Sequence, residues 1–231
     1  MGPTFALAWL ALAVATGFAS PQVQGPWGVA YPPADATAPR PAVVFLHGMW
    51  AGPEEACPLL REAASRFGFL VCPRGNTPFD AGVMWSGTAA DAAGPVRAAL
   101  DEAARMAQGK LDRAADGTLI GYSNGAYFAA ELARAQPGRW PGLVLIGMKL
   151  DLDPARLRAA GVRRVVLAAG DQDETRPSMQ ALAQRFDDGG LPSRFIGLGP
   201  GGHAFPPDMP ARMCDAIAWV RAVDRAVCEG M

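Results

Sequence analysis

The stretch "GTLIGYSNGAYFAAELARA", residues 117–135, is the part of the sequence that decides the fold. Its first five residues are a short apolar run that predicts a buried strand, and the residues after Ser123 have the spacing of an amphipathic helix. Ser123 lies between the two, with Gly121 and Gly125 two residues away on either side. A sharp strand-to-helix turn leaves no room for a Cβ atom at those two positions. The stretch therefore predicts a turn built to expose the Ser123 hydroxyl.

Similar apolar runs recur along the chain and alternate with helical patterns. Strands are predicted over residues 42–46, 69–73, 117–121, 142–148, 163–170 and 193–199. Helices are predicted over residues 53–68, from 94 or 95 onward within 91–111, and over 124–137, 175–187 and 208–226. Such alternation implies right-handed crossovers and a mainly parallel sheet with helices on both faces. We expect one α/β domain over residues 42–231, with too little chain for a lid domain.

Composition and charge narrow the classes of protein that fit. The chain has 231 residues, of which 50% are hydrophobic and 19% charged, which is typical of a compact globular protein. The formal net charge is −1, and the sequence has neither a basic stripe nor zinc-finger spacing. A nucleic-acid partner is therefore not expected.

The N-terminal segment differs from the rest of the chain. Residues 5–19 are apolar and uncharged, which suits the central region of a signal peptide but is shorter than the ~20 residues of a membrane span. No Lys or Arg precedes this run, which is unusual for a signal peptide. We predict a signal peptide over residues 1–19, no stable membrane span, and a secreted or periplasmic protein, with a cytoplasmic one as the alternative. Residues 20–41 are predicted to be a loop with a possible edge strand at 27–31.

The chain has four cysteines, none with the spacing of metal ligands. Export would permit disulfides. Cys57 and Cys72 are the favoured pair, because the start of a helix and the end of the next strand can lie at the same edge of a sheet. The alternative is that these two, with Cys214 and Cys228, are small buried apolar residues. No metal site is expected.

A serine hydroxyl becomes a nucleophile only with a general base, normally a histidine. The chain has two histidines. His47 directly follows a predicted strand and precedes Ser123, which favours a structural role. His203 lies in a Gly- and Pro-rich loop between the last predicted strand and the last helix, where it can reach Ser123 as the base.

The base in turn needs an acid that orients it. Asp171, Asp173 and Glu174 follow the predicted strand 163–170, and spacing alone does not separate Asp171 from Asp173. Further candidates, Asp151 and Asp153, follow the preceding strand.

The order Ser123, aspartate, His203 and the motifs around these residues resemble the α/β-hydrolase superfamily. The motifs are "VVFLHGMW" (43–50), "GYSNGA" (121–126), "AAGDQDETRP" (168–177) and "GGHAFPPDM" (201–209). The resemblance runs from about Ala42 to the C-terminus and is strongest to small lidless members of the dienelactone hydrolase and phospholipase/carboxylesterase type. Dienelactone hydrolases use a cysteine nucleophile, whereas this chain has Ser123. Lactone specificity therefore does not follow, and a serine esterase is the better match.

The resemblance also implies roles for single residues. In the superfamily the acid often lies three residues after a glycine at the strand end, which favours Asp173 and leaves Asp171 second. The two N–H groups that bind the oxyanion would belong to Asn124 and Met49, with Trp50 as the alternative to Met49.

We therefore predict a serine hydrolase that cleaves small-molecule carboxylic esters through an acyl-enzyme, with no metal or cofactor required. Aromatic side chains in the loops expected around the site predict an apolar substrate pocket. These are Trp50, Tyr122, Trp85 and Phe205. The alternatives are a peptidase or amidase of the prolyl oligopeptidase type and a non-catalytic binding protein on a hydrolase scaffold.

Overall fold

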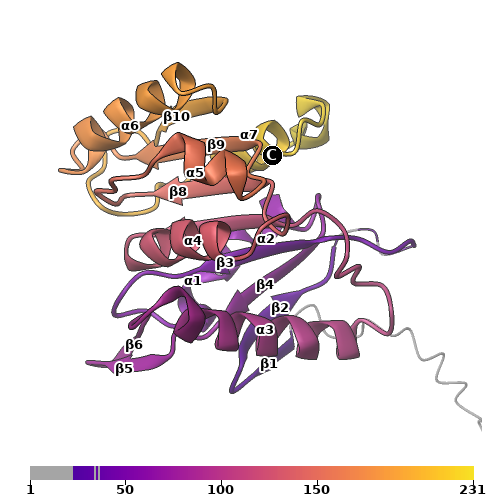
Figure 1. The fold of residues 1–231 in the computed structure, drawn as a ribbon. Coiled ribbons are helices and arrows are strands. Elements are labelled where there is room, and N and C mark those ends of the chain that lie inside the picture. Colours follow the sequence, from indigo (N-terminus) through magenta and orange to yellow (C-terminus); the bar gives the residue numbers. More distant parts are fainter. Residues whose placement is uncertain (1–22, 34, 36) are drawn as a thin grey trace, which may run out of the picture.

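The computed structural model describes residues 23–33, 35 and 37–231, and the predicted signal peptide lies outside them. Its centre is an eight-stranded sheet in the order β1-β2-β4-β3-β7-β8-β9-β10 (Figure 1). Within this sheet, β4, β3, β7, β8, β9 and β10 pair in parallel with their neighbours. β1 and β2 form an antiparallel edge, in which β2 also pairs antiparallel with β4. The sheet strands are Val23–Gly25 (β1), Gly28–Tyr31 (β2), Ala42–Leu46 (β3), Phe69–Pro73 (β4), Thr118–Tyr122 (β7), Gly142–Ile146 (β8), Arg164–Ala169 (β9) and Ser193–Gly197 (β10).

Helices cover both faces of the sheet (Figure 1). One face carries Pro53–Ala56 (α1), Pro58–Ala64 (α2) and Met209–Val220 (α7). The other carries Ala89–Met106 (α3), Asn124–Ala135 (α4), Pro154–Ala159 (α5) and Arg176–Asp188 (α6). A short 3-10 helix, Arg225–Cys228, follows α7, and the hairpin Thr77–Phe79 (β5) and Gly82–Met84 (β6) stands apart from the main sheet.

Two apolar cores, one on each face, explain why the central strands are apolar throughout. Along β3, Val43 and Phe45 belong to the core under α2 and α7, whereas Val44 and Leu46 belong to the core under α3 and α4. All five residues of β3 are buried. A strand covered on both faces needs apolar side chains at every position, because successive side chains point to opposite faces. The six predicted strands and the predicted α/β architecture are confirmed.

The predicted helix over 53–68 is wrong in detail, since the structure divides it into α1 and α2. The division falls at Pro58, which is the first residue of α2. Proline has no N–H and its ring clashes with the preceding turn, so a helix begins there more readily than it continues.

The start of α3 also differs from the prediction. This helix begins at Ala89 rather than at residue 94 or 95, and it contains Pro95 in its second turn. The Thr88 hydroxyl accepts from the Asp91 N–H while the Asp91 carboxylate accepts from the Thr88 N–H, at 3.4 and 2.8 Å. This capping box satisfies two N–H donors at the helix start and explains the earlier beginning.

The N-terminal edge of the sheet corrects a further expectation. The strand predicted at 27–31 exists as β2, but it lies between β1 and β4 and is not at the edge. The edge is β1, in a segment predicted to be loop. The hairpin β5–β6 and helix α5 likewise occupy segments for which no element was predicted.

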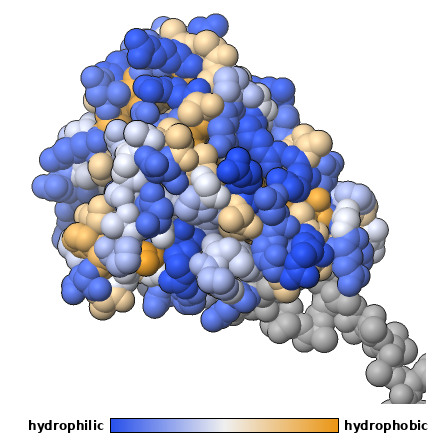
Figure 2. Space-filling model, turned by 60° about the horizontal axis from the view of Figure 1, so that its bottom comes forward, coloured by the Kyte–Doolittle hydropathy of each residue, from blue (hydrophilic) through white to orange (hydrophobic). Residues whose placement is uncertain are grey.

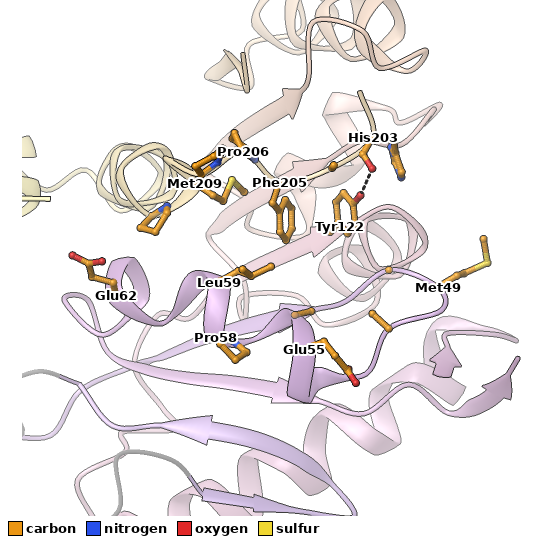
Figure 3. A pocket seen from close by; sticks show the side chains of 16 residues that line it. Met49, Glu55, Pro58, Leu59, Glu62, Tyr122, His203, Phe205, Pro206 and Met209 are labelled. Atoms are coloured by element: carbon orange, nitrogen blue, oxygen red, sulfur yellow. Dashed lines mark hydrogen bonds between the residues drawn. The ribbon is translucent and has the colours of Figure 1, made fainter. Parts of the chain in front are cut away.

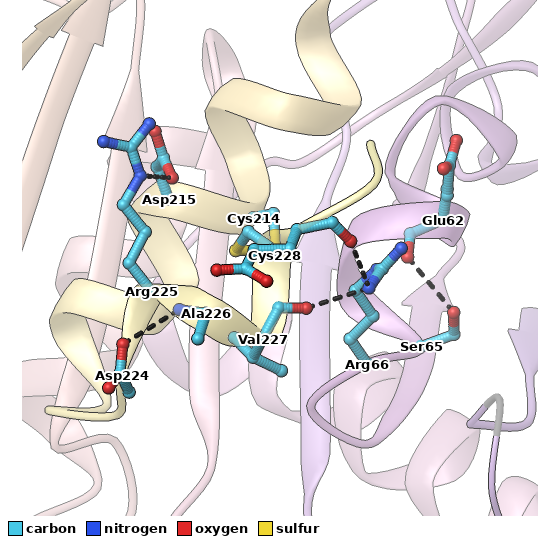
Figure 4. Close-up of a disulfide and its surroundings, with 11 residues drawn as sticks. Glu62, Ser65, Arg66, Cys214, Asp215, Asp224, Arg225, Ala226, Val227 and Cys228 are labelled. Atoms are coloured by element: carbon cyan, nitrogen blue, oxygen red, sulfur yellow. Dashed lines mark hydrogen bonds and ion pairs between the residues drawn. A yellow bond between two sulfur atoms is a disulfide. The ribbon is translucent and has the colours of Figure 1, made fainter.

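All four cysteines form disulfides, Cys57 with Cys72 and Cys214 with Cys228. The first ties the end of α1 to β4, as the sequence favoured, and the second ties α7 to the 3-10 helix (Figure 4). Arg66 donates to the Val227 carbonyl at 2.9 Å beside the second disulfide (Figure 4). The face of the molecule in Figure 2 is mostly hydrophilic, with small separate hydrophobic areas, as is usual for a surface in contact with water.

Candidate active site

Ser123 occupies the turn between β7 and α4 in a conformation that few residues adopt. Its φ is 53° and its ψ is −122°, which lies outside the backbone regions that are favoured for a residue with a Cβ. The Ser123 N–H donates to the Ile146 carbonyl at 2.8 Å, and its carbonyl accepts from Ala126 at 2.9 Å. These bonds hold the turn at the carboxyl end of the central strands, where α/β folds bind ligands.

The two flanking glycines allow this turn because backbone packs directly against them. A Cβ at Gly121 would lie 2.5 Å from Ala126 Cα, and one at Gly125 would lie 2.5 Å from the His47 carbonyl oxygen. Contacts this short do not occur between such atoms, and the opposing backbone cannot rotate away. The steric requirement predicted for these positions is present in the structure.

His203 and Asp173 meet in the loops that follow β10 and β9. His203 Nδ1 lies 2.8 Å from Asp173 Oδ2. The Asp173 side chain is 2% exposed and that of His203 is 42% exposed. The other Asp173 oxygen accepts from the N–H and hydroxyl of Thr175, each at 2.8 Å. The carboxylate is thus held on one side and directed at the imidazole on the other.

Opposing effects act on the pKa of Asp173. Burial favours the neutral carboxyl, but the hydrogen bonds from Thr175 and from His203, together with the His203 charge, outweigh it and lower the pKa below its ordinary value. Asp173 is therefore a carboxylate at neutral pH. A carboxylate at this distance orients the ring with its proton on Nδ1 and leaves Nε2 free to accept one.

The other acidic candidates have different partners. Asp171 Oδ1 lies 2.6 Å from Arg176 Nη1, and Glu174 is 84% exposed and 3.8 Å from Lys149. Asp151 pairs with Arg185 at 2.9 Å, and Asp153 caps α5. Of these acids, Asp173 is the one that the structure brings to His203.

Ser123 and the histidine–aspartate pair converge on the end of β8. Ser123 binds the carbonyl of Ile146, and the next residue, Gly147, packs against the pair. A Cβ at Gly147 would lie 2.8 Å from His203 Cε1 and 3.3 Å from Asp173 Oδ2. Between the described residues Ser123 and His203 no hydrogen bond is formed. Such a bond often tightens only when substrate is bound.

Among the described residues, the backbone N–H groups of Met49 and Asn124 have no hydrogen-bond partner. Asn124 is the first residue of α4, so its N–H is one of the donors that a helix start leaves free. Gly48 brings the loop of Met49 beside Ser123, since a Cβ at Gly48 would lie 3.2 Å from Ser123 Cβ. The two residues predicted to supply the oxyanion donors thus lie in segments next to Ser123.

His47 holds this loop in place through hydrogen bonds of its buried side chain. It is fully buried, and burial lowers its pKa, so the ring is neutral. Its Nε2 accepts from the Gly75 N–H at 3.1 Å, so the proton is on Nδ1, which donates to the Gly48 carbonyl at 2.7 Å. The structural role predicted for His47 fits these contacts.

Trp85 does not line the site, contrary to expectation. It is fully buried, so it is not available to a substrate in this conformation. Its ring N–H donates to the His47 carbonyl at 3.1 Å, and its backbone N–H donates to Asn124 Oδ1 at 2.8 Å. Trp85 therefore joins the two segments that carry the candidate oxyanion donors.

The other predicted aromatic residues divide into two groups. Tyr122 and Phe205 pack together with ring centroids 4.4 Å apart and line a groove of about 660 Å³ that also reaches His203 (Figure 3). Trp50 is 63% exposed, lies against Phe79 at 5.7 Å and is not among the groove residues.

The sequence reasoning missed the opposite wall of this groove. It is formed by Glu55, Pro58, Leu59 and Glu62 from α1 and α2 (Figure 3). The sequence feature that could have indicated this wall is Leu59, an apolar residue on the side of its helix that faces away from the sheet. In the structure Leu59 is 45% exposed.

The described part of the chain has neither a candidate metal site nor a helix that could span a membrane. No group of three or more His, Cys, Asp or Glu residues there could hold a metal ion. None of its helices combines the length and the apolar character needed to cross a membrane.

No family model matches the chain, and no curated protein matches it. Solved structures do. A carboxylesterase from Mesorhizobium loti superposes with a TM-score of 0.62 and 24% identity, covering 86% of this chain and 98% of the other. Esterase PE8 gives 0.65 and 21%, covering 85% and 98%. A fluorophosphonate-binding serine hydrolase of Staphylococcus aureus gives 0.61 and 16%, covering 86% and 96%. Together with the strand order and the turn at Ser123, these matches show that the chain has the α/β-hydrolase fold.

Proposed function

We propose that this protein is a serine hydrolase that cleaves carboxylic esters of small molecules. The observation that carries the proposal is the arrangement of Ser123 on its strained turn with the Asp173–His203 pair at the same end of the sheet. Serine is a weak nucleophile unless a base takes its proton, and a buried carboxylate keeps the base in the correct tautomer. The solved structures of similar fold that are described as esterases and a serine hydrolase support this assignment.

In the proposed reaction, Ser123 Oγ attacks the acyl carbon while His203 Nε2 takes the hydroxyl proton. The resulting imidazolium, stabilised by Asp173, then gives the proton to the departing alcohol oxygen, and an acyl-enzyme remains. Water attacks the acyl carbon next, again losing its proton to His203, and the carboxylic acid leaves with Ser123 restored. Each proton taken from a nucleophile is returned to a leaving oxygen, so the cycle is balanced.

The negative charge on the tetrahedral oxygen would be bound by the Met49 and Asn124 N–H groups. Both come from rigid positions, because α4 begins at Asn124 and His47 holds the carbonyl of Gly48. Loss of one such donor typically lowers kcat by about 10²–10³. Since these donors are backbone groups, replacing the Met49 side chain would alter the lining of the groove but would leave the N–H donor in place.

The direct test compares the protein with Ser123→Ala in two assays. The variant should lose turnover of p-nitrophenyl butyrate and covalent labelling by a fluorophosphonate. Ser65→Ala is the matched control, because the Ser65 hydroxyl makes only a local bond to the Glu62 carbonyl at 3.3 Å. If Ser123→Ala is labelled and turns over ester as the unaltered protein does, the proposed nucleophile is wrong.

A second comparison separates esterase from amidase activity. The p-nitrophenyl ester and the p-nitroanilide of the same acyl group differ only in the leaving atom. We expect kcat/KM for the ester to exceed that for the anilide by several orders of magnitude. Comparable values would instead favour the peptidase or amidase.

We further propose that residues 1–19 are a signal peptide and that the mature protein is secreted or periplasmic. The pairing of all four cysteines in disulfides supports export, because disulfides persist in oxidising compartments. Mass spectrometry of the N-terminus after expression, together with cell fractionation, tests this. A cytoplasmic protein that retains residues 1–19 would contradict it.

A further inference from the structure

The groove that reaches His203 has one wall from α1 and α2 and another from residues 203–210 (Figure 3). Leu59 on the first wall lies opposite Phe205 and Met209 on the second, so the middle part of the groove is apolar. In Figure 3, Glu62 lies at the end of the groove opposite His203 and Met49. A substrate that reacts at the His203 end would therefore extend over apolar side chains toward Glu62.

Two carboxylates, those of Glu55 and Glu62, line the groove. Among the described residues, neither Glu55 nor Glu62 forms an ion pair, and no Lys or Arg lines the groove. One Glu55 oxygen accepts from the Gly52 N–H at 2.7 Å, so this side chain is held in place. The Glu62 carboxylate is exposed and has no described hydrogen-bond partner.

The nearby arginines have other partners, and none of them forms an ion pair with Glu55 or Glu62. Arg74 pairs with Glu54, and Arg212 pairs with Asp208 at 2.8 Å. Arg61 stacks over a tyrosine ring with its guanidinium carbon 5.0 Å from the centroid. Arg66 donates to the Val227 carbonyl, and Figure 4 shows the Glu62 carboxylate directed away from it. Because the lining includes these two carboxylates and no Lys or Arg, the lining of the groove carries net negative charge.

From this charge distribution, and resting on the proposed ester hydrolysis, we propose that the groove selects esters by the charge of their chain. An ester with an apolar chain that ends in a cationic group is preferred, its uncharged analogue is intermediate, and an ester with a terminal carboxylate is rejected. Clefts lined by one sign of charge raise the local concentration of the opposite sign. Glu62 supplies the attraction at the far end, and Leu59 contacts the chain.

Interactions between exposed charges are weak, which sets the expected size of the effect. An exposed pair contributes about 0.2–1 kcal/mol, so one carboxylate should change kcat/KM by up to about fivefold. Such an effect is screened by salt over a Debye length of about 10 Å at 0.1 M ionic strength. The preference should therefore shrink strongly at high salt.

The experiment uses three p-nitrophenyl esters with chains of similar size. They are the trimethylammonio-butanoate ester, its uncharged analogue with a tert-butyl group in place of the trimethylammonium, and the hemiglutarate ester. The readout is the ratio of kcat/KM values within each protein, so a change in overall activity cancels. We expect the cationic ester to exceed the uncharged one by about three- to fivefold at low salt, and the hemiglutarate to fall below it by a similar factor.

Glu62→Gln tests the source of the preference, and Glu102→Gln is its matched control. Glu102 lies on α3, on the opposite face of the sheet, so its replacement changes the net charge equally without touching the groove. The ratio should approach one in Glu62→Gln and stay unchanged in Glu102→Gln. If Glu62→Gln does not fold, the salt series on the unaltered protein carries the same test.

The outcomes separate this proposal from the proposed function. Equal kcat/KM values for the three esters, or a preference that survives Glu62→Gln and high salt, would overturn the charge selection while Ser123-dependent hydrolysis stands. If none of the esters is hydrolysed and Ser123 is not labelled, ester hydrolysis itself is wrong and the charge selection falls with it.

Discussion

The hydroxyl of Tyr122 donates a hydrogen bond to the backbone carbonyl of His203 at 2.9 Å, and the two rings stack with centroids 5.1 Å apart. Tyr122 directly precedes Ser123, so one turn positions the proposed nucleophile and also supports the loop that carries its base. Burial and the charge of Asp173 raise the pKa of Tyr122 to about 12, which keeps the hydroxyl protonated as a donor. Figure 3 shows this bond beside the groove.

We predict that Tyr122→Phe lowers kcat about fivefold for a neutral p-nitrophenyl ester. The change keeps the ring that stacks on His203 and removes only the donor, whose net contribution is about 1 kcal/mol. Because the bond positions the base, most of the loss should appear in kcat and little in KM. Tyr127→Phe is the control, since Tyr127 is 42% exposed on α4. A loss confined to KM would assign Tyr122 to substrate binding alone.

Replacement of Asp173 should separate it from Asp171. We expect Asp173→Asn to lower kcat by about 10⁴, because an amide favours the wrong imidazole tautomer and does not stabilise the imidazolium. Asp171→Asn removes an exposed ion pair to Arg176 and should change kcat less than about fivefold. Steady-state kinetics of both variants measures this, and a larger loss in Asp171→Asn would exchange their roles.

The turn glycines should tolerate no side chain. We expect Gly121→Ala and Gly125→Ala each to lower the free energy of unfolding by about 3 kcal/mol or more, because the atoms opposing the new methyl group are backbone. Gly94→Ala is the contrasting control. Apart from its chain neighbours and the backbone of its own helix, nothing lies within 4 Å of a Cβ at Gly94 in α3, so alanine there should change the free energy of unfolding by no more than about 1 kcal/mol. Urea unfolding curves provide the measurement, and equal effects at all three sites would contradict the steric account.

His47 should make stability depend on pH. Its folded-state pKa is lowered, chiefly by burial, so below about pH 6.5 the unfolded chain takes up a proton that the folded one excludes. The contribution of His47 is therefore complete above that pH and is lost as the pH falls. His47→Asn leaves the Gly75 N–H unpaired and should cost about 1–3 kcal/mol at pH ~7.5.

The difference in unfolding free energy between His47→Asn and the unaltered protein should shrink when the measurement is repeated at pH ~5.5. The variant cannot take up the proton at this position, whereas the unaltered protein is destabilised by it. A difference that stays constant or grows between the two pH values would mean that His47 does not remain neutral in the fold.

Much of the fold follows from local pattern. The central strands are apolar at every position because helices cover both faces, and the glycines around Ser123 reflect contacts within one turn. The helix boundaries that differ from the prediction also have local causes, a proline and a helix cap. Pro58 divides one predicted helix into two. The Thr88 cap starts another helix at Ala89, earlier than the start predicted from Gly94 and Pro95. The edge strand β1 was missed because three residues carry too little pattern.

By itself, the sequence determined the architecture and the candidate nucleophile and base, because periodicity and turn chemistry depend on neighbours along the chain. Tertiary structure decided what depends on neighbours in space. It paired His203 with Asp173 and Arg176 with Asp171, buried Trp85 behind His47, and placed Glu62 at the far end of the groove. These choices depend on how the loops after different strands and the helices of opposite walls pack together, and spacing along one chain does not specify that packing.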